Sequence, residues 1–225
     1  MLKLSIIKLT KTQNTKGVGN MLEEIGEMVS DTVVENVESS SPNQKEIVKY
    51  TVEQLVGEFL KIILMAAIAI YFKIGTLLLI AIFSMAIYRI PSGGVHFKGH
   101  VSCFVASCLI FFGNVFISMN LRGAYLDCLY FFIFLFNIPI IYYFAPADTE
   151  MKPIVSKKLR RNLRIISYVC MIATILIGRF VITDLTIRNI FIIGTLFQSL
   201  TMLPFAYKIA GTKYGFRDGI YEPQI

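Results

Sequence analysis

The sequence predicts an all-α integral membrane protein with about six transmembrane helices, preceded by amphipathic N-terminal helices. Of its 225 residues, 55% are hydrophobic and only 16% are charged, against about 45–50% and about 25% in soluble domains. Charge is unevenly spread, since residues 1–58 have a net charge of −3 and residues 59–225 one of +10. The net charge of +7 could suggest binding to nucleic acid, but no zinc-finger or helix-turn-helix pattern accompanies it. A membrane body with basic loops therefore explains the composition best.

Several apolar stretches are long enough to cross a bilayer, which takes about 20 residues. Three of them meet this length outright, namely Val101–Leu121, Cys128–Ala147 and Asn189–Tyr207. Ile165–Ile182 forms a fourth span if the side chain of Arg179, near its end, reaches the interface. The stretch Phe59–Tyr88 is too long for one straight crossing and has Lys73–Thr76 in its middle. It therefore predicts two short helices in a hairpin.

The distribution of basic residues between the spans predicts which loops face the cytoplasm, because Lys and Arg in short loops stay inside. The segment between the spans Cys128–Ala147 and Ile165–Ile182, here called the basic link, contains Lys152, Lys157, Lys158, Arg160, Arg161 and Arg164. Two predicted crossings separate it from Arg89–His100. Both segments are therefore expected on the cytoplasmic face of a multi-pass protein of the cell membrane.

The N-terminal part has a different character. Apolar residues recur at helical spacing between Met21 and Val33, opposite acidic ones, which predicts an amphipathic helix that packs at the membrane interface or binds a partner. Ser39–Asn43 should end this helix, and a second one starting near Gln44 should run into the first span. The expected organisation is an amphipathic region at 1–43, a membrane domain at 44–210 and a cytoplasmic C-terminal tail at 211–225.

The segment from Arg89 to Cys103 concentrates the polar chemistry of the chain. It holds both histidines and one of the four cysteines. Pro91, Gly93 and Gly94 should interrupt the helix here, because proline lacks an N–H and glycine pairs favour turns. A thiol beside an imidazole is the minimum for nucleophilic catalysis at a carbonyl. The segment thus predicts a loop with a candidate cysteine nucleophile.

Spacing leaves open which histidine would serve Cys103. On an unbroken helix His96 would lie seven residues away, a rise of about 10.5 Å, whereas His100 would lie one turn away. A role for His96 requires a bend, which Gly93, Gly94 and Gly99 allow. We expect residues 91–97 to be irregular, the next helix to begin at or after Phe97, and the His96 ring to come within about 4 Å of the thiol.

Two alternatives to catalysis accompany this segment. One is a structural, hydrogen-bonded histidine beside a packing cysteine. The other is a metal site formed by His96, His100 and Cys103, which the same rise disfavours and which has no nearby carboxylate to complete it. The remaining cysteines, Cys108, Cys128 and Cys170, lie deeper in apolar spans and are interpreted as packing residues. Asp148 and Glu150 are expected on the same face as this segment, and they are interpreted as solvated loop charges in preference to a third catalytic residue that orients the histidine.

The ordered motifs resemble those of the AgrB family, membrane endopeptidases of the accessory gene regulator quorum-sensing system of Gram-positive bacteria. Arg89 stands seven residues before His96, Gly93 and Gly94 shortly before it, and Cys103 seven residues after it. Tyr143-Phe144-Ala145-Pro146-Ala147, then Lys152-Pro153-Ile154 and the basic link, continue the resemblance. Arg89 is followed by Ile90-Pro91, where members of the family often have adjacent basic residues.

The resemblance implies a function and a site. His96 and Cys103 would be the catalytic pair of a cysteine endopeptidase that needs no cofactor or metal. It would remove the C-terminal tail of an AgrD-type pro-peptide and join the new C-terminus to a cysteine or serine of that peptide, which gives a cyclic signal. The alternative to an enzyme is a non-catalytic membrane protein that binds or exports a peptide. A second copy of the chain is a further candidate partner, besides the bilayer.

Supporting roles have alternatives of their own. Arg89 either anchors its span at the interface or holds the loop or a substrate carboxylate. Gly93 and Gly94 either supply turns with positive φ or present N–H donors to an oxyanion. The basic link either contacts anionic lipid or also attracts an acidic substrate tail, the candidates being Lys157, Lys158, Arg160 and Arg161.

Overall fold

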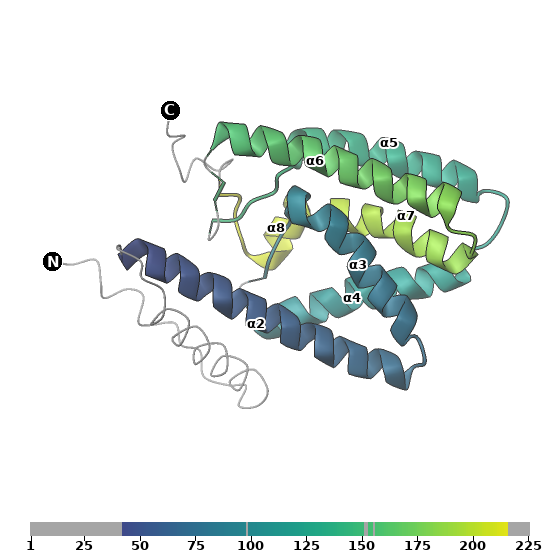
Figure 1. Cartoon of the computed structure of the whole chain (residues 1–225), viewed down its shortest axis with the longest axis horizontal. Coiled ribbons are helices and arrows are strands. Elements are labelled where there is room, and N and C mark those ends of the chain that lie inside the picture. The colour runs from purple at the N-terminus through teal and green to yellow at the C-terminus, as the bar shows by residue number, and fades with distance from the viewer. Residues whose placement is uncertain (1–41, 98, 151–152, 155, 216–225) are drawn as a thin grey trace. The chain divides into compact units, whose positions relative to one another are not determined.

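A computed structural model describes residues 42–97, 99–150, 153–154 and 156–215 of the chain. Over these residues it contains seven α-helices, one π-helical turn and no named strand, which confirms the all-helical prediction. The elements in Figure 1 are α2 (Pro42–Tyr71), α3 (Gly75–Ser92), α4 (His100–Asn120), α5 (Leu126–Phe144), α6 (Lys157–Leu176), η1 (Ile177–Val181), α7 (Leu185–Leu200) and α8 (Pro204–Ala210). The amphipathic helix predicted at Met21–Val33 lies outside the described residues.

The chain divides into two compact units, Met1–Leu64 and Met65–Ile225, with the division inside α2. The helix predicted from Gln44 does run into the following apolar stretch, and α2 ends at Tyr71. Lys73 then adopts a left-handed φ of 58° before α3 begins. The expected break in Phe59–Tyr88 is therefore present, but the helix before it has 30 residues and is not short.

The apolar helices of the second unit give a multi-pass membrane protein. Among the described residues, four helices are long and apolar enough to cross a bilayer, namely α3, α4, α5 and α6 with η1, and a fifth span exists if the bent pair α7 and α8 counts as one. The described helices therefore account for four or five of the six predicted spans, and α2 is not one of them. The count of six stays a prediction. Large apolar side chains such as Phe83, Leu109, Phe131 and Val169 are exposed on these helices, as expected of surfaces that face lipid.

Two helices begin at polar caps. The Ser156 hydroxyl accepts the N–H of Leu159 at 3.3 Å, so α6 starts at Lys157, eight residues before the predicted span. Asp184 accepts the N–H of Ile187 at 2.9 Å and starts α7. Such caps satisfy backbone donors that a helix leaves free at its N-terminus. Arg179 lies in η1, at the other end of the span that starts with α6, and its side chain forms an ion pair with Asp127 at 3.0 Å.

The prediction of one continuous span over Asn189–Tyr207 is wrong. Helix α7 ends at Leu200 and α8 begins at Pro204, with a bend of 72° between them. Pro204 has no N–H and its ring clashes with a preceding helical turn, and Pro is favoured in the first turn of a new helix. The Thr201 hydroxyl donates to the carbonyl of Gln198 at 2.7 Å and closes α7.

Helix α7 is the centre of the membrane body and packs against α3, α4, α5 and α6 (Figure 1). Polar side chains on it are buried and hydrogen-bonded to its neighbours. Asn189 donates to the carbonyls of Ser118 and Leu121 at 3.0 and 2.9 Å, and Thr195 accepts from Asn137 at 2.9 Å. Such bonds fix how helices pair in an apolar medium. The C-terminal end of α7 is therefore a firm support for the loop described next.

Candidate active site

The loop between α3 and α4 is irregular over Gly93–Phe97, and α4 begins at His100, after Phe97 as predicted. Its start differs from the prediction, because Pro91 and Ser92 still belong to α3. Pro91 has no N–H to donate to the preceding turn of α3, so the helix includes it at the cost of one backbone hydrogen bond. The Ser92 hydroxyl donates to the carbonyl of Tyr88 at 2.7 Å, and the Gly93 N–H to that of Arg89 at 2.9 Å.

Gly93 and Gly94 form a tight turn with φ values of 71° and 142°, which L side chains rarely adopt. A Cβ atom on Gly93 would collide with the carbonyl oxygen of Ala147, and one on Gly94 would lie 2.6 Å from Thr201 Oγ1. The N–H of Gly93 donates within α3 and that of Gly94 to Ala147 at 2.9 Å. Both donors are thus engaged within the protein, which agrees with the turn-forming role among those considered for the glycines.

The loop and the segment that leads from α5 into the basic link lie side by side. Gly93 and Ala147 form a parallel bridge, in which the Ala147 N–H donates to the carbonyl of Ser92 at 2.8 Å. Because these bonds join the segment after α3 to the segment after α5, both lie at the same end of the helical body. This agrees with the prediction that they share one face of the membrane.

Arg89 holds the loop from within. One guanidinium nitrogen, Nη1, donates to Gln198 Oε1 and Thr201 Oγ1, each at 3.2 Å, and Nη2 donates to the carbonyl of Val95 at 2.9 Å. The side chain therefore connects the end of α3 to the end of α7 and to the residue before His96. This geometry agrees with the loop-holding role among those considered for Arg89.

Replacing Arg89 with lysine should lower activity about as much as replacing it with alanine. A lysine ammonium is a compact charge on a flexible stem and cannot reproduce the planar fork that reaches acceptors on two segments. We expect both variants to insert into membranes and to lose at least about 10-fold in the rate of pro-peptide processing. Near-normal activity of Arg89→Lys would show that the residue only anchors its span.

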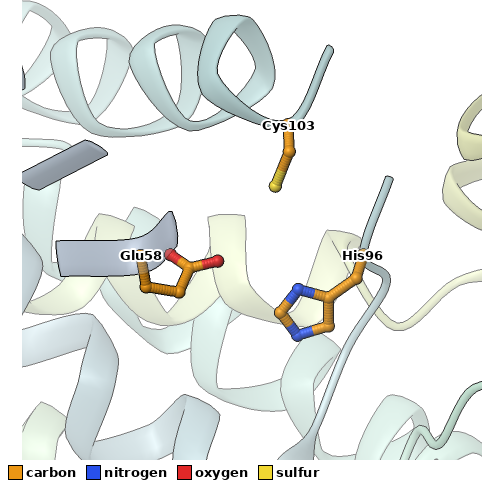
Figure 2. Close-up of side chains that lie close together, drawn as sticks. All are labelled: Glu58, His96 and Cys103. Atoms are coloured by element: carbon orange, nitrogen blue, oxygen red, sulfur yellow. The ribbon is translucent and has the colours of Figure 1, made fainter. Parts of the chain in front are cut away.

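His96 and Cys103 lie together at the end of this loop. The side chain of Cys103 extends from the first turn of α4 and that of His96 from the loop, and they point toward one another (Figure 2). A ring nitrogen of His96 and Cys103 Sγ are within 4.8 Å of one another, in line with the expectation that a bend brings them together. Glu58, which Figure 2 also labels, belongs to the other compact unit.

The start of α4 adds an electrostatic feature to the thiol. The N–H of Cys103 donates to the carbonyl of Gly99 at 3.0 Å, which places Cys103 in the first turn of α4. The partial positive charge of a helix N-terminus stabilises an anion there. The site thus places a thiol and an imidazole close together at the N-terminus of a helix. The side chain of His100 lies outside the described residues.

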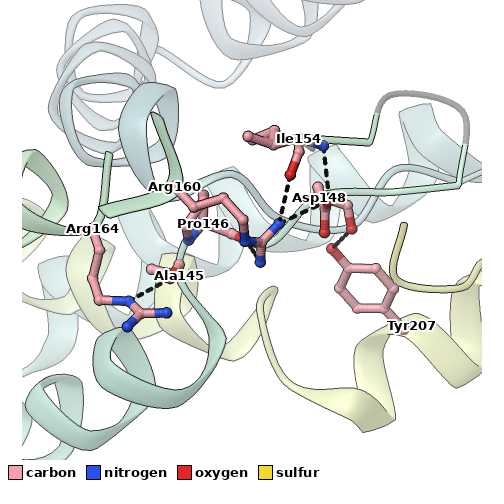
Figure 3. A network of polar contacts seen from close by, with 7 residues as sticks. All are labelled: Ala145, Pro146, Asp148, Ile154, Arg160, Arg164 and Tyr207. Carbon is pink, nitrogen blue, oxygen red and sulfur yellow. Dashed lines mark hydrogen bonds and ion pairs between the residues drawn. The ribbon is translucent and has the colours of Figure 1, made fainter. Parts of the chain in front are cut away.

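The interpretation of Asp148 as a solvated charge is wrong. Its carboxylate is buried and accepts the N–H of Ile154 at 2.9 Å and Arg160 Nη1 at 3.0 Å (Figure 3). Arg160 also donates to the carbonyl of Pro146 at 3.2 Å, and Arg164 to that of Ala145 at 2.9 Å. The basic link is thereby tied to the segment that bridges the Gly93 turn. The sequence shows these residues only as charges in a loop.

Asp148→Ala should destabilise the protein strongly. It leaves the Arg160 side chain, only 12% exposed, without its carboxylate, and breaking a buried ion pair from one side costs about 3–5 kcal/mol. We expect a clear fall in the midpoint of thermal unfolding in detergent. The matched control is Asp127→Ala, which removes the exposed pair with Arg179 and should cost at most about 1 kcal/mol. Equal effects of the two variants would contradict this assignment.

The four basic candidates for substrate binding separate into two kinds. Arg160 is engaged with Asp148 as described, whereas Lys157, Lys158 and Arg161 are exposed on the first turns of α6.

Of the cysteines other than Cys103, Cys108 and Cys170 are partly buried and Cys128 is exposed. Beyond the predicted site, Tyr214 of the expected C-terminal tail stacks on Tyr207 with ring centroids 3.8 Å apart.

Sequence reasoning missed the two residues at the C-terminal end of α7 that support the loop, Gln198 within the helix and Thr201 just after it. Gln198 is fully buried and donates to the Gly93 carbonyl at 2.6 Å and to Ser92 Oγ at 3.0 Å. The carbonyl of Thr201 accepts the N–H of Val95 at 3.1 Å. The available signal was a glutamine inside an apolar span, because polar groups there are costly and tend to be functional.

Comparison with known proteins identifies the family. The model of the family described as accessory gene regulator B matches residues 27–202. An AgrB-like protein of Clostridium acetobutylicum is 26% identical over 199 residues, which cover 88% of this chain and 93% of the relative.

Two further relatives agree with this match, and no solved structure matches the chain. The accessory gene regulator protein B of Staphylococcus aureus strain bovine RF122 is 31% identical over 163 residues, 70% of this chain and 81% of that protein. An AgrB-like protein of Clostridium perfringens strain SM101 is 28% identical over 152 residues, 64% and 69% of the two chains. The chain belongs to the accessory gene regulator B family.

Proposed function

We propose that this protein is a membrane cysteine endopeptidase of a quorum-sensing system, with Cys103 as nucleophile and His96 as base and then acid. The observation that carries the proposal is the approach of the His96 ring to Cys103 Sγ, within 4.8 Å, on a loop that a rigid helix end supports. The substrate is the pro-peptide that works with the family, of the AgrD type, and the site faces the cytoplasm, where thiols stay reduced.

The reaction proceeds through an acyl-enzyme. His96 takes the thiol proton, the Cys103 sulfur attacks the carbonyl carbon of the scissile bond, and the C–N bond breaks as the imidazolium protonates the leaving amine. This releases the C-terminal tail and leaves the remaining peptide as a thioester on Cys103. A thiol or hydroxyl of the same peptide then attacks the thioester, giving its proton to His96. The Cys103 sulfur leaves and recovers that proton, and the product is a cyclic thiolactone or lactone.

Co-expression with a pro-peptide encoded beside the gene tests this function. Mass spectrometry of the peptide should show the loss of its C-terminal tail and, for the cyclised product, a mass lower by one water than that of the linear fragment. The wild-type protein should yield this product and Cys103→Ala should not. Recovery of only intact peptide bound to the wild-type protein would instead support the non-catalytic binding or exporting protein.

Neutralising Lys157 and Lys158 to glutamine should raise KM for a substrate with an acidic tail and leave kcat nearly unchanged. Both side chains are exposed on α6, so their attraction of an acidic tail is screened by salt, with a Debye length of about 10 Å at 0.1 M. We expect the difference in KM between variant and wild type to shrink as salt rises. An unchanged KM at low salt would leave contact with anionic lipid as the role of these residues.

A further inference from the structure

Gln198 has a place in the fold that its role in helix packing does not explain. Its side chain is fully buried near the end of α7, next to the turn after α3. The amide nitrogen donates to the Gly93 carbonyl at 2.6 Å and to Ser92 Oγ at 3.0 Å, and the amide oxygen accepts Arg89 Nη1 at 3.2 Å. Both ends of the amide therefore contact the candidate catalytic loop or the arginine that holds it.

These bonds complete a chain of restraints that ends next to His96. The Gly93 carbonyl accepts from the Gln198 amide, and the Gly93 N–H donates to the backbone carbonyl of Arg89. The Val95 N–H donates to the Thr201 carbonyl. The Val95 carbonyl accepts from the Arg89 guanidinium, which also donates to Gln198. With these peptide groups before His96 fixed, the backbone that leads into His96 has little freedom in where it places that residue.

We propose that Gln198 is a positioning residue, which sets the distance between His96 and Cys103 by holding the Gly93–Gly94 turn and Arg89 together. The inference rests on the proposed function. A buried amide costs free energy unless its donors and acceptor are paired, and here the loop and Arg89 supply those partners. If Gln198 only filled space, an apolar side chain of similar size would serve equally well in an apolar body.

Two substitutions separate the contacts of the amide. Gln198→Glu keeps the shape and an acceptor for Arg89 Nη1, but a carboxylate cannot donate to the Gly93 carbonyl. Gln198→Met keeps approximate volume and removes every polar contact. Asn137→Leu is the matched control, because it removes a buried amide that bonds to Thr195, three residues earlier on α7 and away from the loop. All three are purified in detergent, and their thermal unfolding is compared with that of the wild type.

The measurement is the rate at which iodoacetamide alkylates Cys103, in a background with Cys108, Cys128 and Cys170 replaced by alanine. This rate reports the thiolate that His96 supports, which a purely structural role would not alter in folded protein. We expect alkylation and kcat to fall together by about 10- to 100-fold in both Gln198 variants, with KM little changed, since displacement of a catalytic group by about 1 Å can cost 100-fold. Asn137→Leu should lower the unfolding midpoint and leave the alkylation rate within about twofold of the wild type.

The outcomes distinguish this inference from the proposed function. If His96→Ala slows alkylation and the Gln198 variants do not, the positioning role is refuted while the catalytic pair stands. If His96→Ala has no effect on alkylation or processing, the proposed function itself fails. A loss of reactivity in Asn137→Leu as large as in the Gln198 variants would also overturn the inference, because general weakening of α7 packing would then explain both.

Discussion

We expect the substitution Cys103→Ala to abolish pro-peptide processing while the protein still inserts into the membrane. Without the sulfur no acyl-enzyme can form, and removing the nucleophile of a catalytic unit typically lowers kcat by about 10⁴-fold or more. Cys103→Ser should be nearly as inactive, because an unactivated hydroxyl is a far weaker nucleophile than a thiol near neutral pH. Both variants are compared with the wild type by mass spectrometry of the co-expressed peptide, at matched protein levels in the membrane fraction.

The other cysteines are the controls for this experiment. Cys108 and Cys170 are partly buried along α4 and α6, and Cys128 is exposed near the start of α5. None belongs to the loop that holds His96, so Cys108→Ala, Cys128→Ala and Cys170→Ala should each keep most of the activity. Full activity in Cys103→Ala, or its loss only in one of these three, would rule out the mechanism.

The sequence predicts the helices better than it predicts where they bend. Apolar stretches give α4 and α5 to within a few residues, because a membrane leaves the backbone little choice but a helix. Residue counts do not show that Ser156 starts α6 at its cap or that Pro204 turns the last span by 72°. In both cases a single residue decides the boundary, and its effect depends on the neighbours that its backbone and side chain meet.

At the candidate site, local chemistry is visible in the sequence and tertiary support is not. His96, Cys103 and the glycine turn lie within eleven residues, so their pairing follows from a bend that the glycines permit. Gln198 bonds to residues more than 100 positions away. No pattern along one chain predicts that contact, because it depends on how α7 packs beside α3. The same limit explains why the sequence indicates a solvated charge at Asp148, whose partner Arg160 lies twelve residues farther on.

His96→Ala should remove activity, whereas His100→Ala should reduce it modestly at most. Helix geometry alone would favour His100, one turn from Cys103 on a regular helix. His100 and Cys103 do lie one turn apart in α4, but the chain before them is not helical, since Gly93–Phe97 is irregular. The bend brings a ring nitrogen of His96 within 4.8 Å of the thiol sulfur, a placement that suits an imidazole expected to take the thiol proton.

Processing and iodoacetamide alkylation of Cys103 together test this assignment. In His96→Ala both should fall, because the thiol loses the base that takes its proton, and the processing rate should drop by about 10²-fold or more. His96→Gln keeps a polar side chain that can hydrogen-bond but cannot act as a base near neutral pH, so it should be as inactive as the alanine variant. In His100→Ala both rates should stay within about tenfold of the wild type. The reverse pattern, with His100→Ala inactive and His96→Ala active, would assign the base to the first residue of α4 and would require a different loop conformation during catalysis.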